Sequence, residues 1–244
     1  MQKAATLSAE SQTPIHLGNE KHFQTAIAYL KKTDPILARA IKEHGTLEFK
    51  PGGDVFESLV ESIIAQQLAW SAASAIITRL RALYPRKALR PALIHATPVS
   101  KLRKAGVSPQ KIRYLKDLSS RVVNGKLDLR NADKMSDAEL IEALDEVLGI
   151  GPWTVQMLLI FTLGRPDVLP VDDLGVRKGI QMLYSLDGLP KPKAIEELAL
   201  NWHPYCSVAS LYLWKVKDSA PLAKISAGSA NKNDGKKERK KVTG

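Results

Sequence analysis

Cysteine is nearly absent from this chain of 244 residues, since Cys206 is the only one. A single thiol excludes an internal disulfide and any iron–sulfur or zinc cage built from cysteines alone. Long apolar runs are also missing, because no stretch approaches the roughly 18 residues of a membrane span. The segment 1–20 is polar and lacks the apolar core of a signal peptide. We therefore expect no membrane association and a reducing, intracellular environment.

Acidic residues are few relative to basic ones. The chain has 36 Lys and Arg against 25 Asp and Glu, a net charge of +11, and a pI near 9.6. Such an excess favours a polyanionic partner, although charge alone does not define a function. Seven basic and two acidic residues lie in 219–244, which leaves a net charge of +6 on the rest.

The two ends of the chain differ from its middle. Residues 219–244 are rich in Lys, Ser, Ala, Gly and Asn and predict a disordered basic tail. Its charge run at 236–241 resembles a nuclear-localisation or nucleic-acid patch, although a solvated tail would have the same composition. Residues 1–20 lack apolar periodicity and are predicted to be flexible, which leaves 21–218 as one folded domain. We expect a nuclear protein if the source is eukaryotic and a cytoplasmic one otherwise.

Between these ends, apolar residues recur at helical spacing, and alternating runs typical of strands are missing. The predicted fold class is all-α. Capping signals predict four helix starts, at Asp54 with Glu57, at Ser71, at Ser108 and at Ser136 with Glu139. Further helices are predicted over 152–163, 173–184, 193–201 and 204–216.

Two details of these helices can be predicted as well. The helix that starts at Ser71 is expected to bury one face, made of Ala72, Ala75, Ile76, Leu80 and Leu83. The pair Asn124-Gly125 follows a helix and fits a C-terminal cap better than a hairpin turn.

The segment 148–154, Leu-Gly-Ile-Gly-Pro-Trp-Thr, joins two predicted helices through a tight turn. Two glycines allow close approach of the backbone to another surface. Gly151 and Pro152 open the next helix, whose free N–H groups and positive dipole end suit a DNA phosphate. An ordinary αα-hairpin would use the same two glycines, but the longer pattern is more specific and looks like the helix–hairpin–helix of DNA repair proteins.

About twenty residues later, Asp172 and Asp173 precede another predicted helix. At a helix start, the dipole and free N–H groups favour the charged carboxylate. A carboxylate beside a sugar C1′ can stabilise an oxocarbenium-like transition state or orient the attacking water. Plain helix capping would also explain one aspartate here. With two acids adjacent, one can cap while the other acts in catalysis.

Four motifs in order resemble the helix–hairpin–helix/Gly-Pro-Asp superfamily of DNA glycosylases, and within it the 3-methyladenine DNA glycosylase II group. The resemblance runs from about His22 to Lys217, with the hairpin over about 140–163. It implies a two-lobed helical fold. The motifs are Ser62–Leu68, Leu148–Thr154, Pro170–Val176, and Trp202–Tyr205 with Ser210–Trp214.

The resemblance implies roles for individual residues. The family's catalytic aspartate directly precedes Leu-Gly, which selects Asp173, whereas alignment on Pro-Val-Asp would select Asp172. The damaged nucleotide would be flipped out of the duplex into a pocket. Gln67, flanked by Leu68, would fill the vacated stack, although glutamines that merely end a helix would look the same.

The remaining implied contacts concern DNA and the flipped base. Trp153 and then Tyr205 are the pocket candidates, because an electron-rich ring suits a positively charged methylated purine. Trp202, Trp214 and Phe161 are expected to pack in the core. The hairpin residues expected to contact DNA are Gly149, Ile150, Gly151 and Thr154.

Two substitutions refine the expected chemistry. Bifunctional relatives carry a Schiff-base lysine two residues after the second hairpin glycine, where this chain has Trp153. A monofunctional glycosylase is therefore expected. The endonuclease III branch holds an iron–sulfur cluster with four cysteines, which Cys206 alone cannot do. The family often has arginine at the position of Cys206, so a basic contact is expected to be lost here.

No cofactor and no metal ligand set are predicted. The five histidines show no metal-ligand spacing with one another or with Cys206. A monovalent cation on hairpin carbonyls is compatible with the family resemblance and leaves no trace in sequence. The predicted function is hydrolytic excision of alkylated purines of the 3-methyladenine and 7-methylguanine type, by a monomer acting on double-stranded DNA. The alternative is a non-catalytic binder of damaged or abasic DNA with the same fold.

Overall fold

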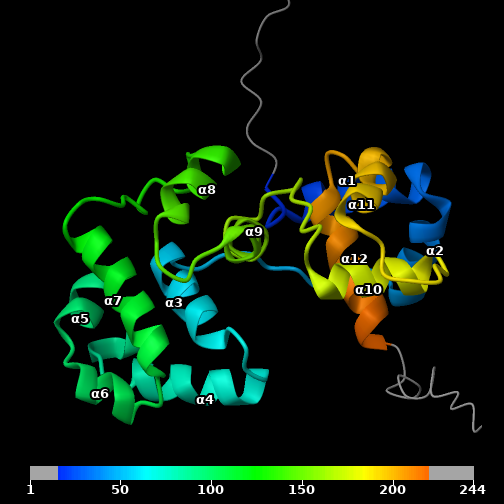
Figure 1. Cartoon of the computed structure of the whole chain (residues 1–244). Helices are drawn as coiled ribbons and strands as arrows, with labels where there is room; N and C mark the ends of the chain where they lie inside the picture. Colours follow the sequence, from blue (N-terminus) through cyan, green and yellow to red (C-terminus); the bar gives the residue numbers. More distant parts are fainter. Residues whose placement is uncertain (1–15, 220–244) are drawn as a thin grey trace, which may run out of the picture.

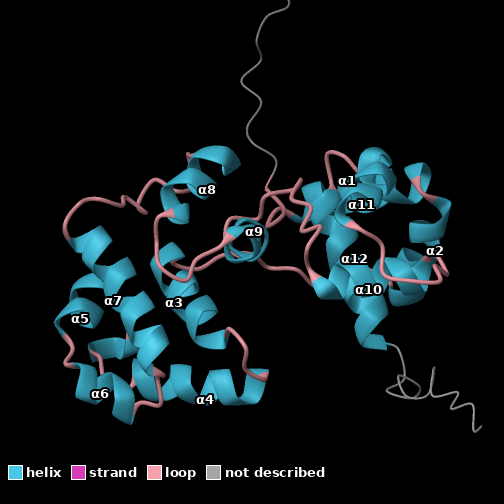
Figure 2. Cartoon of the chain, viewed as in Figure 1, coloured by secondary structure: helices cyan, strands magenta, loops and turns pink. Residues whose placement is uncertain are grey.

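The computed structural model describes residues 16–219, and every regular element in that range is a helix (Figure 2). The prediction of an all-α fold is confirmed. The helices gather in two lobes with α9 (Pro152–Phe161) between them (Figure 1). No helix in 16–219 combines the length and apolar character needed to cross a membrane. The predicted basic tail, apart from Ser219 at the end of α12, and most of the predicted flexible N-terminus lie outside the described residues.

The central lobe is formed by the middle of the chain and has its own apolar core, which extends from Phe56 to Val168. Its helix α7 runs through this lobe and packs against α5 and α3. Besides α9, the lobe contains α3 (Val55–Ala65), α4 (Trp70–Arg81), the short 3₁₀ helix η1 (Pro85–Lys87), α5 (Pro91–Ala96), α6 (Val99–Lys104), α7 (Pro109–Val123) and α8 (Asp137–Asp145).

The terminal lobe joins the two ends of the described chain around a second core. Trp202 is fully buried in it, as expected. Because the chain starts and finishes in this lobe, residues far apart in sequence meet there. Its elements are α1 (Glu20–Thr33), α2 (Pro35–His44), α10 (Leu174–Leu183), α11 (Pro192–Leu198), the 3₁₀ helix η2 (Ala199–Asn201) and α12 (Cys206–Ser219).

Local capping chemistry explains several helix ends. The Ser108 hydroxyl accepts from the Lys111 amide at 3.3 Å at the start of α7. Ser136 and Glu139 form a reciprocal capping box at the start of α8, as predicted. The chain leaves α7 through Asn124, followed by Gly125 at a φ of +69°. This turn confirms the predicted C-terminal cap.

Two other helix starts differ from expectation. Asp54 accepts from the Glu57 amide, but the Glu57 carboxylate binds Arg81 and the Leu89 amide and leaves the predicted capping box half formed. The fourth helix starts at Trp70 without a side-chain cap, so the predicted cap at Ser71 is wrong.

The buried face of α4 is also rotated from the predicted one. Ala73, Ile77 and Leu80 are buried, whereas Ala72 and Ala75 are exposed and Leu83 lies beyond the helix end. Alanine is compatible with either face of a helix, so its spacing alone could not determine the register.

The boundary of the folded part lies before residue 20. Leu17 is buried, and its amide donates to the Gly164 carbonyl at 2.8 Å, which ties the start of the terminal lobe to the end of α9. The sequence of 16–19 is polar apart from Leu17, which is why periodicity missed it.

Asp34 organises the core of the terminal lobe. Its Oδ1 caps α2 through the Ile36 and Leu37 amides, and its Oδ2 accepts from the indole of Trp202 at 2.8 Å and from the Tyr184 hydroxyl. Burial opposes ionisation of this carboxyl, but these hydrogen bonds outweigh it and hold the pKa of Asp34 below its ordinary value. The stability that Asp34 contributes is therefore present above the unfolded pKa and is lost as the pH falls through the lower folded value.

Candidate functional site

The Asp173 carboxylate lies at the N-terminus of α10 and is only 9% exposed. Its Oδ1 accepts from the Val176 amide at 2.8 Å and from the Trp214 indole at 2.7 Å, while Oδ2 accepts from the Trp153 indole at 2.8 Å. A carboxylate has about four acceptor positions, so one on Oδ2 remains available. Three N–H donors from three helices thus hold both oxygens in a fixed orientation.

Trp214 reaches Asp173 because α10 and α12 pack very closely. A Cβ added at Gly175 would lie 2.6 Å from Trp214 Cδ1, and one added at Gly179 would lie 2.3 Å from the Leu213 carbonyl oxygen. Both distances are far below an allowed contact. Leu174-Gly175 therefore follows Asp173 because only glycine leaves room for the indole that binds the carboxylate.

An aromatic cluster continues from this indole. The rings of Trp214 and Phe161 lie 5.4 Å apart, and those of Phe161 and Phe49 6.0 Å apart. All three line an open depression of about 390 Å³, whose other lining residues include Glu48 and Lys215. The depression combines apolar ring faces with a charged edge, directly beside the partner of Asp173.

The sequence-predicted pocket residues are therefore partly corrected. Trp153 is 44% exposed and donates to Asp173, but it does not line the aromatic depression, so its place in a base pocket stays a prediction. Tyr205 is only 9% exposed and packs edge to face on Tyr29 in the terminal lobe core, so it offers no free ring face. Trp214 and Phe161, expected in the core, instead line the depression. Periodicity cannot distinguish a core position from a position at the edge of a pocket.

Of the two candidate acids, Asp172 is exposed and makes no side-chain hydrogen bond within the described residues. Asp173 is buried and bound from three sides. The three-dimensional arrangement thus favours Asp173 over Asp172 as the residue with an organised chemical environment.

The hairpin turn depends on Gly149. Its φ of +80° disfavours other residues, and an added Cβ would lie 2.2 Å from Cδ2 of the Tyr114 ring. The Gly149 carbonyl accepts from the Gln66 side-chain amide at 2.7 Å, which links the turn to the end of α3. Neighbouring Leu148 is exposed, and its amide donates to Asp117.

Several backbone N–H groups at the start of α9 are unpaired within the described residues. Within 16–219, the amides of Gly151, Trp153 and Thr154 find no hydrogen-bond acceptor. The side chains of Thr154 and Ile150 are buried, however, so the expected contacts of these two residues with DNA are restricted to their backbone. Ile150, in the turn before α9, belongs to the core of the central lobe, and Thr154 is buried in the first turn of α9.

The structure brings the hairpin and the end of α3 into one groove of about 390 Å³. The Lys111 ammonium donates to the carbonyls of Ile64 and Gln66, at 2.8 and 2.7 Å. Burial lowers the pKa of Lys111. The motif at the end of α3 and the hairpin motif, about eighty residues apart in sequence, therefore share this surface. The residues that line it are Gln66, Gln67, Gln110, Lys111, Tyr114, Gly149, Ile150 and Gly151.

An exposed segment projects from this groove between α3 and α4. Gln67 has a φ of +57°, and it is exposed together with Leu68. Trp70, 73% exposed, follows them at the start of α4. Sequence reasoning found Gln67 and Leu68 but missed Trp70. The available signal was an aromatic residue directly after Gln-Gln-Leu-Ala, where no apolar stripe required it.

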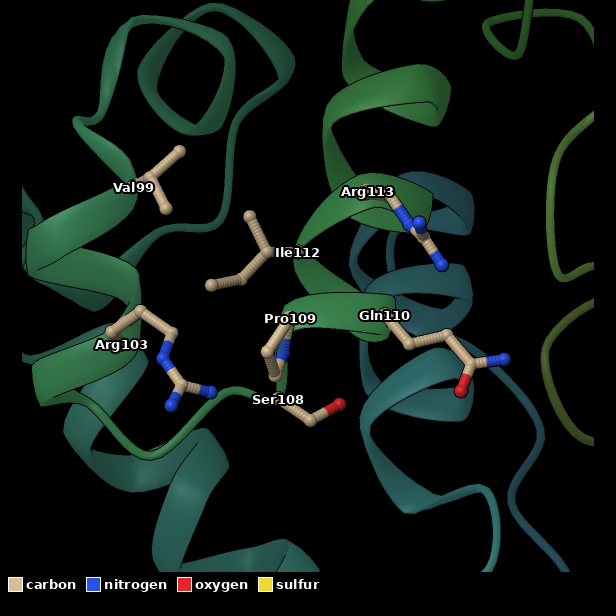
Figure 3. A pocket seen from close by; sticks show the side chains of 7 residues that line it. All are labelled: Val99, Arg103, Ser108, Pro109, Gln110, Ile112 and Arg113. Carbon is tan, nitrogen blue, oxygen red and sulfur yellow. The ribbon is translucent and has the colours of Figure 1, made fainter.

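A second open depression, of about 500 Å³, adjoins the groove through Gln110. Figure 3 shows Arg103 from α6 and Arg113 from α7 among its lining side chains. The groove and this depression are therefore positive in character. The groove has Lys111 and the unpaired N–H groups at the start of α9, and the depression has the guanidinium groups of Arg103 and Arg113. Such surfaces suit a phosphate backbone.

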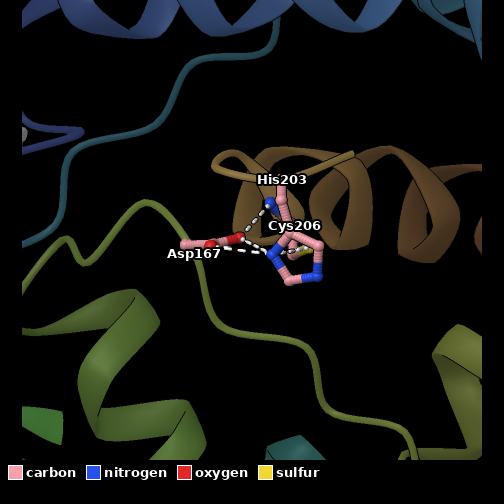
Figure 4. Close-up of side chains that lie close together, drawn as sticks. All are labelled: Asp167, His203 and Cys206. Carbon is pink, nitrogen blue, oxygen red and sulfur yellow. Dashed lines mark hydrogen bonds and ion pairs between the residues drawn. The ribbon is translucent and has the colours of Figure 1, made fainter. Parts of the chain in front are cut away.

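Histidine and cysteine do come together at one place, contrary to the sequence analysis. The tertiary structure places Asp167 beside His203 and Cys206 (Figure 4). Burial, with a further contribution from the Asp167 charge, raises the pKa of the Cys206 thiol.

At the hairpin, the carbonyls of Val147 and Gly149 already accept protein N–H groups. A monovalent cation there stays a prediction.

Comparison with known proteins agrees with this arrangement. A sequence model of the HhH-GPD superfamily of base excision DNA repair proteins matches residues 60–204. The putative DNA-3-methyladenine glycosylase YfjP of Bacillus subtilis is 31% identical over 202 residues, which cover 80% of this chain and 70% of the relative. DNA-3-methyladenine glycosylase 1 of Schizosaccharomyces pombe is 34% identical over 171 residues, 69% of this chain and 75% of that protein.

Solved structures show the same architecture. The S. pombe 3-methyladenine DNA glycosylase Mag1 in complex with abasic DNA superimposes with a TM-score of 0.72 at 32% identity, covering 78% of this chain and 95% of that one. A DNA-3-methyladenine glycosidase from Bacillus halodurans gives the same TM-score at 34% identity, covering 84% and 92%.

Proposed function

The chain belongs to the HhH-GPD superfamily of base excision DNA repair proteins, and we propose that it is a monofunctional DNA glycosylase that hydrolyses the N-glycosidic bond of alkylated purines. The observation that carries the proposal is the Asp173 carboxylate, oriented by two indoles and one amide beside an aromatic depression.

Asp173 would act on charge that develops at the sugar. In the reaction the C1′–N bond breaks with its electron pair going to the base, and water adds to C1′ and loses a proton. A methylated purine already carries a positive charge, so it departs as a neutral base without a separate acid. The negative oxygen of Asp173, fixed by its donors before the reaction, stabilises the cationic sugar at no cost of reorganisation.

The aromatic cluster supports selection of the base. Ring faces of Trp214, Phe161 and Phe49 suit a flat cationic purine, and each cation–π contact contributes on the order of 0.5–2 kcal/mol. An unmodified purine lacks this attraction and retains the stronger glycosidic bond. Discrimination would therefore come from both binding and leaving-group chemistry.

The DNA itself would bind at the hairpin groove. Free amides at the start of α9 and the remaining donor of Lys111 suit phosphates. Gln67 and Leu68 would enter the duplex where the flipped nucleotide leaves. We expect the enzyme to act as a monomer, and in the nucleus if its source is eukaryotic.

The test of this proposal is a base-release assay with duplexes that contain 3-methyladenine, 7-methylguanine, ethenoadenine or hypoxanthine. We expect release of the cationic methylated purines and an intact abasic strand. Borohydride should trap no covalent adduct, because Trp153 occupies the position of the lyase amine. Tight binding of abasic duplex without release of any base would support the non-catalytic alternative instead.

Trp70 provides a separate prediction about DNA binding. Because its exposed indole follows the segment proposed to enter the duplex, we expect it to stack on a nucleotide beside the gap. Stacking on an aromatic side chain contributes about 1–3 kcal/mol per base, so Trp70→Ala should weaken binding of abasic duplex by about 5- to 150-fold. Fluorescence anisotropy of labelled duplex would measure this change. The matched control is Leu200→Ala, 70% exposed on the terminal lobe, and an equal loss in both variants would contradict the assignment.

A further inference from the structure

Asp167, His203 and Cys206 form a side-chain cluster on the terminal lobe side of the fold, outside the catalytic and DNA-binding residues (Figure 4). Asp167 lies in the segment between α9 and α10, while His203 and Cys206 flank the start of α12. One ligand-type atom from each residue lies within 4.8 Å of the others. We propose that this cluster binds one divalent transition-metal ion of the zinc type.

The spacing of the sulfur and nitrogen supports this assignment. Cys206 Sγ and His203 Nδ1 are 3.6 Å apart. A tetrahedral ion with a sulfur at about 2.3 Å and a nitrogen at about 2.0 Å holds these two atoms about 3.5 Å apart. The pair is therefore already at the separation that tetrahedral coordination requires.

The carboxylate requires only a small movement. His203 Nδ1 lies 2.8 and 3.0 Å from the two oxygens of Asp167. Tetrahedral coordination would place nitrogen and oxygen about 3.3 Å apart, so the carboxylate would move back by roughly 0.3–0.5 Å. Asp167 Oδ1 also accepts from the Cys206 amide at 3.2 Å, which orients the carboxylate toward the cluster.

The chemistry of the donor set favours a zinc-type ion. Thiolate, imidazole and carboxylate are the three side-chain ligands that zinc uses, and oxygen-preferring ions such as magnesium do not select sulfur. A thiolate and a carboxylate balance the charge of a divalent ion. The Asp167 and His203 side chains are 34% and 49% exposed, so an ion and a fourth, water ligand have access from solvent, while Cys206 forms the buried floor.

A catalytic triad is not an alternative explanation of this geometry. In a triad the histidine contacts the acid through one nitrogen and the nucleophile through the other. Here Nδ1 of His203 faces both Asp167 and Cys206. Convergence of all three groups on one point is the arrangement of a coordination site.

Metal binding at this position would strengthen an existing connection between the segment 166–168 and the start of α12. The Ser207 amide donates to the Pro166 carbonyl at 3.0 Å, and the Val168 amide donates to the Ser207 hydroxyl at 2.9 Å. The same two segments lead on to Asp173 and to Trp214. The proposed ion would therefore clamp the segment that carries the carboxylate to the helix that carries its indole partner, as a structural site.

The test uses the full chain, stripped with a chelator and titrated with Co²⁺ as a spectroscopic probe and with Zn²⁺. We expect one ion per chain, a thiolate-to-cobalt charge-transfer band, and a Tm that rises with Zn²⁺ concentration. Cys206→Ser should abolish the band, and His203→Ala should weaken binding at least about tenfold and remove most of the Tm rise. His203→Ala alters a half-exposed side chain, so it tests the site even if Cys206→Ser, at a buried position, prevents folding.

The matched control is His95→Ala, an exposed histidine on α5 in the central lobe. It should leave stoichiometry, spectrum and Tm rise unchanged. Absence of a thiolate band in the native chain would overturn the proposal, as would equal binding by the native chain and His203→Ala. Because the readouts are binding and stability, they do not depend on glycosylase activity.

Discussion

Replacing Asp173 by asparagine is expected to lower the rate of base release from methylated duplex by at least about 10²-fold. The variant removes the negative charge that is proposed to face the sugar. Asp173 accepts from three N–H groups, those of the Val176 amide and the Trp214 and Trp153 indoles. The single amide oxygen of asparagine cannot accept from all three, so the NH₂ group of the variant would face at least one of these donors. Single-turnover release of 3-methyladenine measures the effect.

The matched control for this prediction is Asp172→Asn. Asp172 is adjacent and carries the same charge, but it is exposed and unbonded within the described residues. It should therefore keep a rate within a few-fold of the native chain. Both variants should bind abasic duplex with similar affinity, which separates chemistry from binding. A larger loss of rate in Asp172→Asn would reassign the catalytic carboxylate.

Gly149→Ala is expected to destabilise the protein by about 2–4 kcal/mol. The positive φ costs about 1 kcal/mol or more for alanine, and relief of the overlap with Tyr114 adds about 1–3 kcal/mol. Because the Gly149 carbonyl also binds Gln66, displacement of the turn should disturb the proposed DNA groove and weaken binding of abasic duplex. Urea unfolding and anisotropy measure the two effects.

Gly151→Ala is the informative comparison. Its φ of −117° is ordinary, and an added Cβ would meet no atom within 4 Å. Stability should therefore change by less than about 0.5 kcal/mol. The new methyl group nevertheless lies beside the free amides at the start of α9, so DNA binding should weaken without loss of stability. If Gly151→Ala binds abasic duplex as the native chain does, the phosphate would have to bind elsewhere.

Sequence motifs selected the candidate residues of the site but not the side chains that surround them. A helix start marks Asp173 and a tight turn marks the hairpin glycines, whereas the expected roles of Trp153 and Gln67 follow from the family resemblance. The structure adds that the Trp153 indole donates to Asp173. Trp214 was assigned to the core, because nothing local shows that it reaches a carboxylate 41 positions earlier. That contact exists only because Gly175 and Gly179 let two helices approach.

The sequence by itself determined the helical class, several helix starts and the location of the acidic and hairpin motifs, since spacing and capping are properties of neighbouring residues. Cys206 shows what it could not determine. As a lone cysteine it excluded disulfides and cysteine-only clusters, and the histidines showed no partner at a recognisable spacing. The tertiary structure decided that Asp167, 39 positions away, lies beside it. It also decided which indoles hold Asp173. Both depend on packing between lobes and helices, where the geometry arises from burial of surfaces that are distant in the chain.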